Sequence, residues 1–311
     1  MFKYIIRRIL IAIPTIFITI SMIFFGLRIL PGDPAVQILG PEASEQALNA
    51  LREQMGLNLP LWQQYFIFLK DTVQGDFGVS AMSGKSVTGQ LLANFPNTVE
   101  LAIFSVIIGC AIGIPLGILA ARKQSTKIDS GIRLLSLIGI SAPPFLFGII
   151  MILIFSLRIP IFPSMGLGEG LWGRFYHLFL PSLTIGLILA AVMMRFTRAS
   201  MLDEINREYI RTARAKGIPE KVVIYKHVLR NSLIPVITVI GLYITSLISG
   251  AVLIETIFSR PGLGTLAIDA ISSRDFPILQ GCLILFTLVV QFVNIIVDIS
   301  YSFINPKIRP E

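Results

Sequence analysis

Charged residues are scarce in this sequence. Asp, Glu, Lys and Arg make up 14% of its 311 residues, against about 25% in soluble globular domains. Hydrophobic residues make up 54%, and a soluble chain of this length would have difficulty hiding so much apolar surface. The composition therefore argues against a soluble domain and favours a chain that spans a lipid bilayer.

Cysteine and histidine are also rare, with two of each. Cys110 and Cys282 lie inside long apolar runs, so they offer neither a disulfide framework nor a metal-ligand spacing. We interpret them as packing residues. His177 and His227 are too few and too far apart for a histidine metal site, and the sequence predicts no metal bound by this chain.

The net charge of +8 does not indicate nucleic-acid binding, because the basic residues lie in short stretches between apolar runs without interleaved aromatic residues. The first stretch, Lys3 to Arg8, precedes an apolar run that continues to Leu30. A secretory signal core is shorter, about 7–15 residues. We therefore expect a retained first helix.

Six apolar stretches are long enough, or nearly long enough, to cross a bilayer as helices. Most of the 26 Lys and Arg residues lie in the N-terminus, the loops after the second and fourth stretches and the C-terminal tail, which predicts that both termini are cytoplasmic. The predicted spans are Ile9–Leu30, Thr98–Ala121, Leu134–Leu157, Leu178–Met194, Asn231–Ile254 and Phe276–Val297.

The sequence divides into a first helix with its tail (1–30), a long outer loop (31–97) and a five-helix core (98–311). Helical spacing predicts helices at Glu42–Met55 and Leu61–Val73 in the outer loop, which either docks an external partner or caps the bundle. A further apolar stretch, Thr265–Ser273, is too short to span and predicts a surface or re-entrant helix.

The inner loop, residues 199–230, predicts two short helices that meet at Gly217. Pro219 follows this glycine as at a helix C-cap, and a second amphipathic run, Glu220–Leu229, leads into the fifth span. Small and basic residues surround the turn. The loop is either a slim knob that inserts into a soluble partner or a basic segment lying on anionic headgroups.

Residues of this loop resemble the Glu-Ala-Ala loop of binding-protein-dependent ABC importer permeases, in which a coupling helix docks in a groove of the ATPase. Ala213 matches the second alanine and Gly217 the glycine, whereas Arg211 and Thr212 depart from the general pattern, and Arg230 replaces its later proline. The resemblance implies that the ATPase-coupling residues are Arg211, Thr212, Ala213, Arg214, Ala215, Lys216 and Gly217.

The departures are typical of the peptide and nickel subfamily of these importers. The chain is similar to that subfamily in Tyr209–Gly217 and His227–Pro235, and in five shorter motifs: Leu30–Pro34, Gln74–Gly78, Pro261–Gly264, Arg274–Pro277 and Asn305–Pro306. Two further segments, Gly40–Ala43 and Met194–Ser200, most resemble the glutathione-import branch.

The resemblance implies an all-α polytopic fold of the type I importer class in the bacterial inner membrane. It implies four further subunits, namely a second permease and two ATPases that bind ATP and Mg²⁺, and a solute-binding protein. The chain itself would be non-catalytic and would bind no cofactor or nucleic acid. The glycines near Gly78–Ser86 are spaced one residue too far apart for a Walker A loop.

Small and polar residues in the spans are candidates for a solute path, although for any single residue helix–helix packing is the favoured explanation. They are Ser136, Ser141 and the predicted helix break at Pro143 and Pro144 in the third span, and in the last two spans Thr245, Ser246, Ser249, Gly250, Gln291 and Asn294.

Three other functions remain as alternatives. Nickel or metal-chelate import would use the same architecture. An ion-coupled transporter or an intramembrane enzyme would need charged or catalytic groups at mid-membrane, and the sequence gives little support for either.

Overall fold

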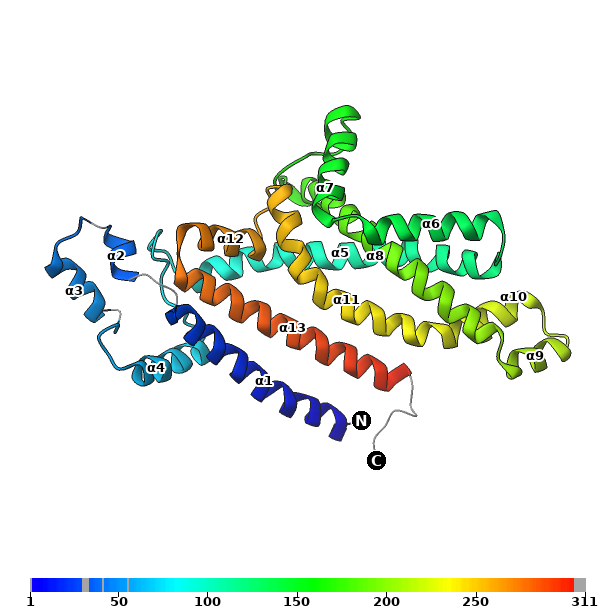
Figure 1. The fold of residues 1–311 in the computed structure, drawn as a ribbon, viewed down its shortest axis with the longest axis horizontal. Helices are drawn as coiled ribbons and strands as arrows, with labels where there is room; N and C mark the ends of the chain where they lie inside the picture. The colour runs from blue at the N-terminus through cyan, green and yellow to red at the C-terminus, as the bar shows by residue number, and fades with distance from the viewer. Residues whose placement is uncertain (1, 30–33, 41, 55, 305–311) are drawn as a thin grey trace. The chain divides into compact units, whose positions relative to one another are not determined.

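The computed structural model describes residues 2–29, 34–40, 42–54 and 56–304. Regular structure in these residues is helical apart from one isolated antiparallel bridge between Val79 and Ser86. Within these residues, five helices are long and apolar enough to cross a membrane (Figure 1). These are α1 Phe2–Ile29, α5 Val87–Arg122, α8 Gly170–Ile205, α11 Leu229–Ile257 and α13 Phe276–Ile304.

The third predicted span, Leu134–Leu157, is not one continuous helix. It consists of α6 Lys127–Ser141 and α7 Pro144–Ile152, followed by the π-helix η1 Leu153–Arg158, and the two halves are bent by 104°. Ala142 and Pro143 have extended backbones between them, because a residue before proline avoids the α region and proline has no N–H to donate. The all-α polytopic membrane fold is confirmed, and it has six spans when this bent pair counts as one.

Two helices extend well beyond their predicted apolar segments. Both α5 and α8 contain 36 residues, whereas we predicted Thr98–Ala121 and Leu178–Met194. Hydropathy identifies only the apolar segment of a helix that can lie in the hydrocarbon core of a membrane. The polar first turns of α5 and the last turns of α8 lie outside that segment, but they continue the helical backbone hydrogen bonds.

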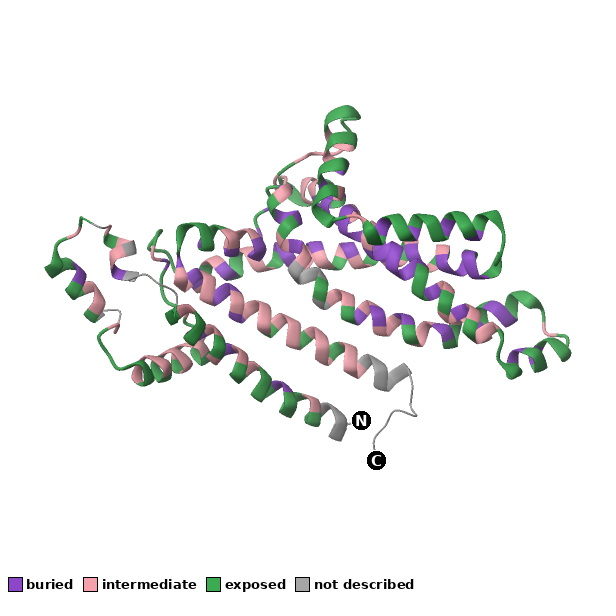
Figure 2. Ribbon diagram, in the orientation of Figure 1, coloured by how far each residue is buried: buried purple, intermediate pink, exposed green. Residues whose placement is uncertain are grey.

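The chain forms two compact units, one of residues 1–8, 98–260 and 292–311, and the other of residues 9–97 and 261–291. In the first unit, α8 packs against both α6 and α11, and its most apolar window is 72% buried. Figure 2 shows the buried residues concentrated along α8. Its core includes Leu180, Leu189, Met193, Ile254 and Phe258.

A row of glycines lets α5 approach α8 closely. Gly109, Gly113 and Gly117 recur at every fourth position of α5, and a Cβ added at any of them would lie 2.6–2.7 Å from atoms of α8. At Gly113 the nearest of these atoms is the carbonyl oxygen of Ala190. Small residues at this spacing allow membrane helices to pack backbone to backbone.

The second unit contains most of the predicted outer elements. The predicted helices at 42–55, 61–73 and 265–273 correspond to α3 Glu45–Gln54, α4 Leu61–Gln74 and α12 Leu263–Ser273, so these predictions are confirmed within a few residues. A further short helix, α2 Pro34–Leu39, was not predicted.

Asp275 fastens the loop after α4 to the segment between α12 and α13. Its buried carboxylate accepts hydrogen bonds from the Ser80 hydroxyl (2.5 Å), from the Ala81 N–H (3.2 Å) and from the Met82 N–H (3.4 Å). Asp275 belongs to the Arg274–Pro277 motif noted in the sequence, and Ser80 closely follows the Gln74–Gly78 motif. These hydrogen bonds therefore connect the two motif regions.

Candidate functional site

The inner loop follows α8, which ends at Ile205. Arg207 then has an extended backbone, and α9 Glu208–Ala215 is followed by the turn at Gly217 and by α10 Glu220–Val222, the π-helix η2 Val223–Val228 and α11. Two helices therefore meet at Gly217, as predicted. Residues 199–205, which we assigned to the loop, belong to α8.

Gly217 is required by its backbone conformation. Its φ is +75°, and a Cβ added there would meet no heavy atom within 4 Å. Its N–H donates to the carbonyl of Arg214 (2.9 Å), and the N–H of Ile218 donates to that of Ala213 (3.3 Å). Left-handed residues with such bonds typically end helices, and glycine adopts this conformation with the least strain.

The loop rests on a small core of its own. Ile210 is fully buried and Ala213 nearly so, and they pack with residues from the ends of α5 and α8 and from η2, namely Ile118, Ala121, Met201, Val223, Ile224 and Val228. Burying these apolar side chains fixes one face of α9 against the helices. A force applied to α9 would therefore reach α5 and α8 directly.

The opposite face of the loop is exposed and basic. Arg211, Thr212, Arg214, Ala215, Lys216 and Gly217 are all exposed. Arg214 forms a two-pronged ion pair with Glu220 across the turn (Nε–Oε2 3.0 Å, Nη2–Oε1 2.7 Å), and hydrogen bonding to that carboxylate raises the pKa of Arg214. Arg211 and Lys216 form no ion pair with any described residue, so their charges face outward.

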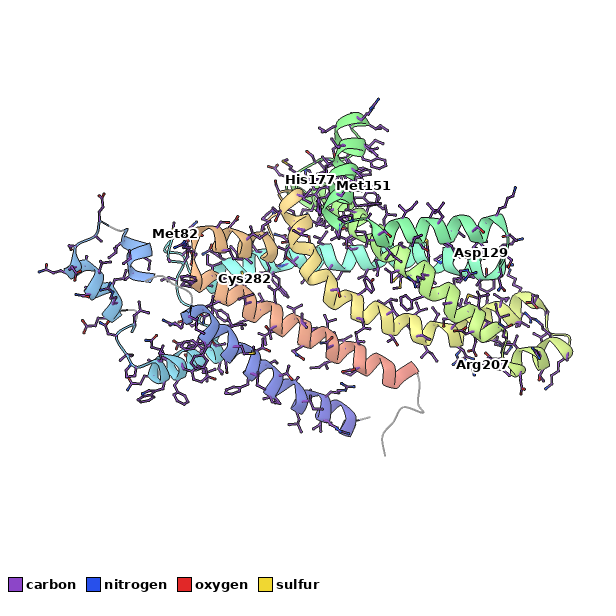
Figure 3. All side chains as sticks on the ribbon, viewed as in Figure 1. Met82, Asp129, Met151, His177, Arg207 and Cys282 are labelled. Carbon is purple, nitrogen blue, oxygen red and sulfur yellow. The ribbon has the colours of Figure 1, made fainter. Side chains whose placement is uncertain are left out.

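Tyr209 connects the loop to both neighbouring helices. Its hydroxyl donates to Glu204 at the end of α8 and accepts from the amide of Asn231 in α11 (2.8 Å). Burial, and secondarily the hydrogen bond to Glu204, raise the pKa of Tyr209. The hydroxyl therefore stays protonated and continues to donate at neutral pH. Figure 3 shows Arg207 beside this junction.

A buried ion pair holds α6 to α8 at the same end of the bundle, and the sequence did not reveal it. Asp129 is 1% exposed and accepts two hydrogen bonds from Arg198 (2.6 and 2.9 Å). It also accepts one from the N–H of Ser125 (3.0 Å). The pattern Thr126-x-x-Asp129 is a readable helix-start signal, but nothing in the sequence points to a partner 69 residues away.

The predicted path residues are spread over four helices, α6, α7, α11 and α13. Ser141, Pro143 and Pro144 are exposed at the bend between α6 and α7. Ser136 is buried against α8 and donates to the carbonyl of Arg133 (2.8 Å), and Ser246 donates to that of Leu242 (3.3 Å). These two serines therefore bond within their own helices and do not join α6 to α11.

Of the remaining path candidates, Gly250 on α11 and Gln291 and Asn294 on α13 are half-buried. The side chains of Thr245 and Ser249 lie outside the described residues, as do Leu30–Asp33, Pro41 and Asn305–Pro306 from the motifs. The assignment of a solute path to these residues stays a prediction.

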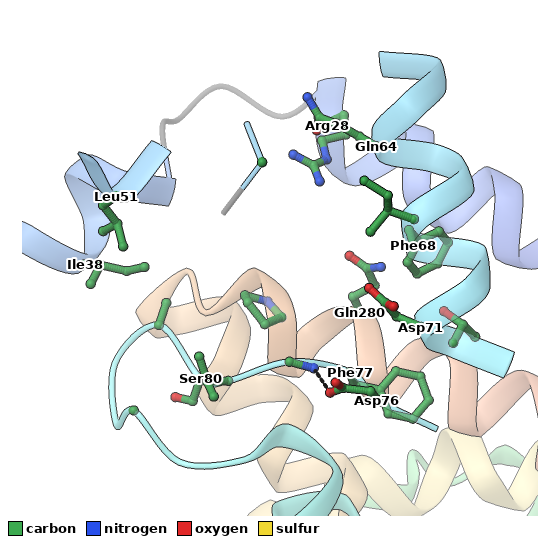
Figure 4. Close-up of a pocket in the computed structure, with 18 of the residues that line it drawn as sticks. Arg28, Ile38, Leu51, Gln64, Phe68, Asp71, Asp76, Phe77, Ser80 and Gln280 are labelled. Atoms are coloured by element: carbon green, nitrogen blue, oxygen red, sulfur yellow. Dashed lines mark hydrogen bonds between the residues drawn. The ribbon is translucent and has the colours of Figure 1, made fainter. Parts of the chain in front are cut away.

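The second unit contains a cavity of about 680 Å³ whose wall mixes charged and aromatic side chains. Figure 4 shows Arg28, Phe68, Asp71, Phe77 and Gln280 around it. The N–H of Gly78 donates to Asp76 (2.8 Å) in the same wall. Its lining residues belong to the predicted outer part of the chain.

Two family models match the chain. The model described as "Binding-protein-dependent transport system inner membrane component" matches residues 113–310. A second, for the N-terminal part of such membrane components, matches residues 1–102. Among curated proteins, the glutathione transport system permease proteins GsiC of Escherichia coli strain K12 and of Shigella dysenteriae are each 41% identical over 309 residues, which cover 99% of both chains.

Solved structures show the same fold. Two crystal forms of the MetNI methionine ABC transporter in inward-facing conformations contain a chain that superposes with TM-scores of 0.58 and 0.54, at 16% and 18% identity. The superpositions cover 70% and 69% of this chain and 96% of the matched chains. At this identity the likeness concerns the fold alone.

Proposed function

This chain belongs to the family of binding-protein-dependent transport system inner membrane components, and on that premise we propose that it is the permease subunit of an ATP-driven importer of short peptides. The observation that carries the proposal is the exposed basic loop of α9, whose other face is anchored on α5 and α8. Such a loop suits a chain that is moved by a partner.

The proposed cargo is glutathione or another short peptide. Its support is the 41% identity over 99% of the chain to proteins named as glutathione transport permeases. Nickel or a metal chelate is the alternative within the family. In the described part of the chain, no three His, Cys, Asp or Glu residues are grouped to hold a metal ion, so the peptide reading has the more direct support.

The proposed assembly contains a second permease, two ATPase subunits and a solute-binding protein. The family description itself specifies dependence on a binding protein, and the solved relative is an ABC transporter. We assign the binding of ATP and Mg²⁺, and the hydrolysis of ATP, to the partner ATPases. This chain would then be a non-catalytic transport subunit.

In the proposed mechanism the ATPases bind the exposed face of α9. Because Ile210 and Ala213 are buried against the ends of α5 and α8, movement of the loop would move α8. Since α8 also packs closely on α6 and α11, the bundle would rearrange with it. Closure of the ATPases around ATP would open the path outward, and hydrolysis would reset it, which is alternating access driven by partner binding energy.

The loop and both chain termini are proposed to face the cytoplasm. The support is the concentration of Lys and Arg in the segments on that side. The second unit, with α3, α4 and α12, would then face outward toward the binding protein.

The test replaces Gly217 by valine in the complete importer. A β-branched residue at φ +75° costs roughly 1–2 kcal/mol of backbone strain, so the turn should relax and displace the face formed by α9. We expect the variant to enter the membrane normally but to lose ATP-driven peptide uptake in proteoliposomes.

Gly170→Val is the matched control. Gly170 has φ +66°, is exposed and also has open space around its Cβ position, but it lies at the start of α8, far along the helix from the loop. The control should retain uptake. Uptake by Gly217→Val at the level of Gly170→Val would contradict the coupling role.

A further inference from the structure

A cavity of about 410 Å³ lies between α6 and α8, in the first unit, and is separate from the coupling face of α9. Three arginines line it, namely Arg133 on α6 and Arg195 and Arg198 on α8. Its other lining residues are mainly apolar and include Leu137, Ile140 and Met194. A cavity with guanidinium groups at its wall and hydrocarbon beside them has an amphipathic character.

The positive charge of this cavity exceeds the negative charge that the chain supplies. Asp129 is the only carboxylate in contact with the three arginines among the described residues, and its two oxygens are occupied by Arg198. Arg133 reaches the same carboxylate at only 3.6 Å and is 55% exposed. Arg195 is exposed and forms no ion pair with a described residue. Arg133 also donates to the hydroxyl of Ser130 (3.2 Å), but the long contact with Asp129 leaves its charge only partly compensated. Arg133 and Arg195 can therefore both approach an external anion.

The apolar wall continues onto the surface of α6. Leu137 is 59% exposed and Ile140 is 37% exposed, and Leu134 and Ile138 are exposed beside them. Only Asp129, Ile132, Ser136 and Gly139 of α6 are buried, so the rest of the helix is open along its length. A flexible acyl chain could lie along this surface while its headgroup meets the arginines.

The cavity also lies near the end of the bundle that is predicted to face the cytoplasm, where lipid headgroups are expected. Its arginines are near the turn from α5 to α6, at the end of the bundle that leads from α8 into the α9 loop, and Figure 3 shows Asp129 at that end. The turn itself carries exposed Arg122, Lys123 and Lys127. Basic pockets between membrane helices on the cytoplasmic side are suited to anionic headgroups.

We infer that this cavity binds the phosphate of an anionic phospholipid of the inner leaflet, with Arg133 and Arg195 as the headgroup ligands and the exposed leucines of α6 against one acyl chain. Guanidinium groups suit phosphate because they donate two parallel hydrogen bonds to its oxygens. A peptide carboxylate would meet the same arginines, but the apolar wall favours a molecule that carries its own hydrocarbon.

The test uses the whole importer in nanodiscs that contain a photoactivatable phosphatidylglycerol or, in parallel, a photoactivatable phosphatidylcholine at equal fraction. Crosslinked peptides are then quantified by mass spectrometry. We expect phosphatidylglycerol to label the α6 and α8 peptides several-fold more than phosphatidylcholine. The double variant Arg133→Gln/Arg195→Gln should lower that labelling by more than tenfold, given about fivefold for each basic residue.

Lys123→Gln is the control, because Lys123 is exposed on the same end of the bundle but does not line the cavity. It should leave the labelling nearly unchanged. Equal labelling by both lipids in the wild-type assembly would overturn the inference, and this comparison needs no variant to fold. The inference would also be overturned if Lys123→Gln lost as much phosphatidylglycerol labelling as the double variant. The same holds if the double variant kept its labelling and changed only the KM for acidic peptides.

Discussion

At the scale of single residues, Asp129 connects the start of α6 to the neighbouring helix α8. Its backbone N–H donates to the hydroxyl of Thr126, the N-cap of α6 (3.4 Å). Its carboxylate accepts the N–H of Ser125 and pairs with Arg198 on α8 through two short hydrogen bonds. Charge-assisted bonds of this kind are stronger than neutral ones. Removing one partner of a buried pair is costly, because the other charge is left without compensation.

We therefore predict that Asp129→Asn destabilises the protein by about 3 kcal/mol, the lower end of the range for broken buried pairs, since Arg198 retains some contact with water. The loss is measured as a lower apparent Tm of the purified importer in detergent. Asp203→Asn, the same change at an exposed position of α8, should alter stability by less than about 0.5 kcal/mol. Equal shifts in the two variants would show that the pair is not structural.

The sequence predicted the role of single residues where the residue type itself determines the backbone conformation. Gly217 and Pro219 mark a turn in any surroundings, and the structure confirms the turn. The Asp129–Arg198 and Ser80–Asp275 contacts join residues 69 and 195 positions apart. No local pattern relates such positions, so one sequence could not reveal either contact.

At the scale of helices, the same Gly→Ala change is expected to have opposite effects on stability at the α5–α8 contact and on the exposed face of α6. Gly113→Ala would place a Cβ 2.6 Å from the carbonyl oxygen of Ala190, so α5 and α8 must separate. Overpacking of this kind typically costs about 1–3 kcal/mol. The apparent Tm of the importer should fall by several degrees.

Gly131→Ala is the matched change on α6. Gly131 is exposed and nothing lies within 4 Å of the added Cβ, so the change should be neutral or stabilise by up to about 1 kcal/mol through helix propensity. The two variants are compared in one melting experiment. A Gly113→Ala protein as stable as Gly131→Ala would mean that α5 and α8 do not pack backbone to backbone.

Helices were predicted well where apolar content or helix-end residues define them, as for α3, α4, α12 and the long spans. The bend of α6 and α7 was only partly foreseen. Pro143 and Pro144 pointed to a break, but their sequence cannot give an angle of 104°. That angle depends on how α7 packs against α8 and α11, which is tertiary information.

At the scale of the whole molecule, the orientation in the membrane can be tested with two single cysteines. In a chain carrying Cys110→Ala and Cys282→Ala, we place one cysteine at Lys216 or at Lys70, both exposed. The charge distribution predicts that position 70 faces outward and position 216 faces the cytoplasm. A membrane-impermeant maleimide should label position 70 in intact cells and position 216 only after the cells are opened.

The reverse labelling pattern would invert the proposed topology and remove the α9 loop from the reach of cytoplasmic ATPases. Labelling of both positions in intact cells would indicate leaky membranes, which a cytosolic cysteine protein in the same cells reveals independently.

The fold class followed from composition and apolar run length alone. Orientation and partners depend on the membrane and on other chains.

The carboxylate of Asp275 has a consequence for how the protein is made. In the proposed topology the Ser80 loop would leave the ribosome and cross the membrane before residue 275 is translated. The N–H groups of Ala81 and Met82 would then lack their acceptor on the outer side. A nascent chain stalled before the sixth span would expose that loop to surface proteases. Completion of translation would thus act as the closing step of the outer structure, and quality control could distinguish finished from unfinished copies there.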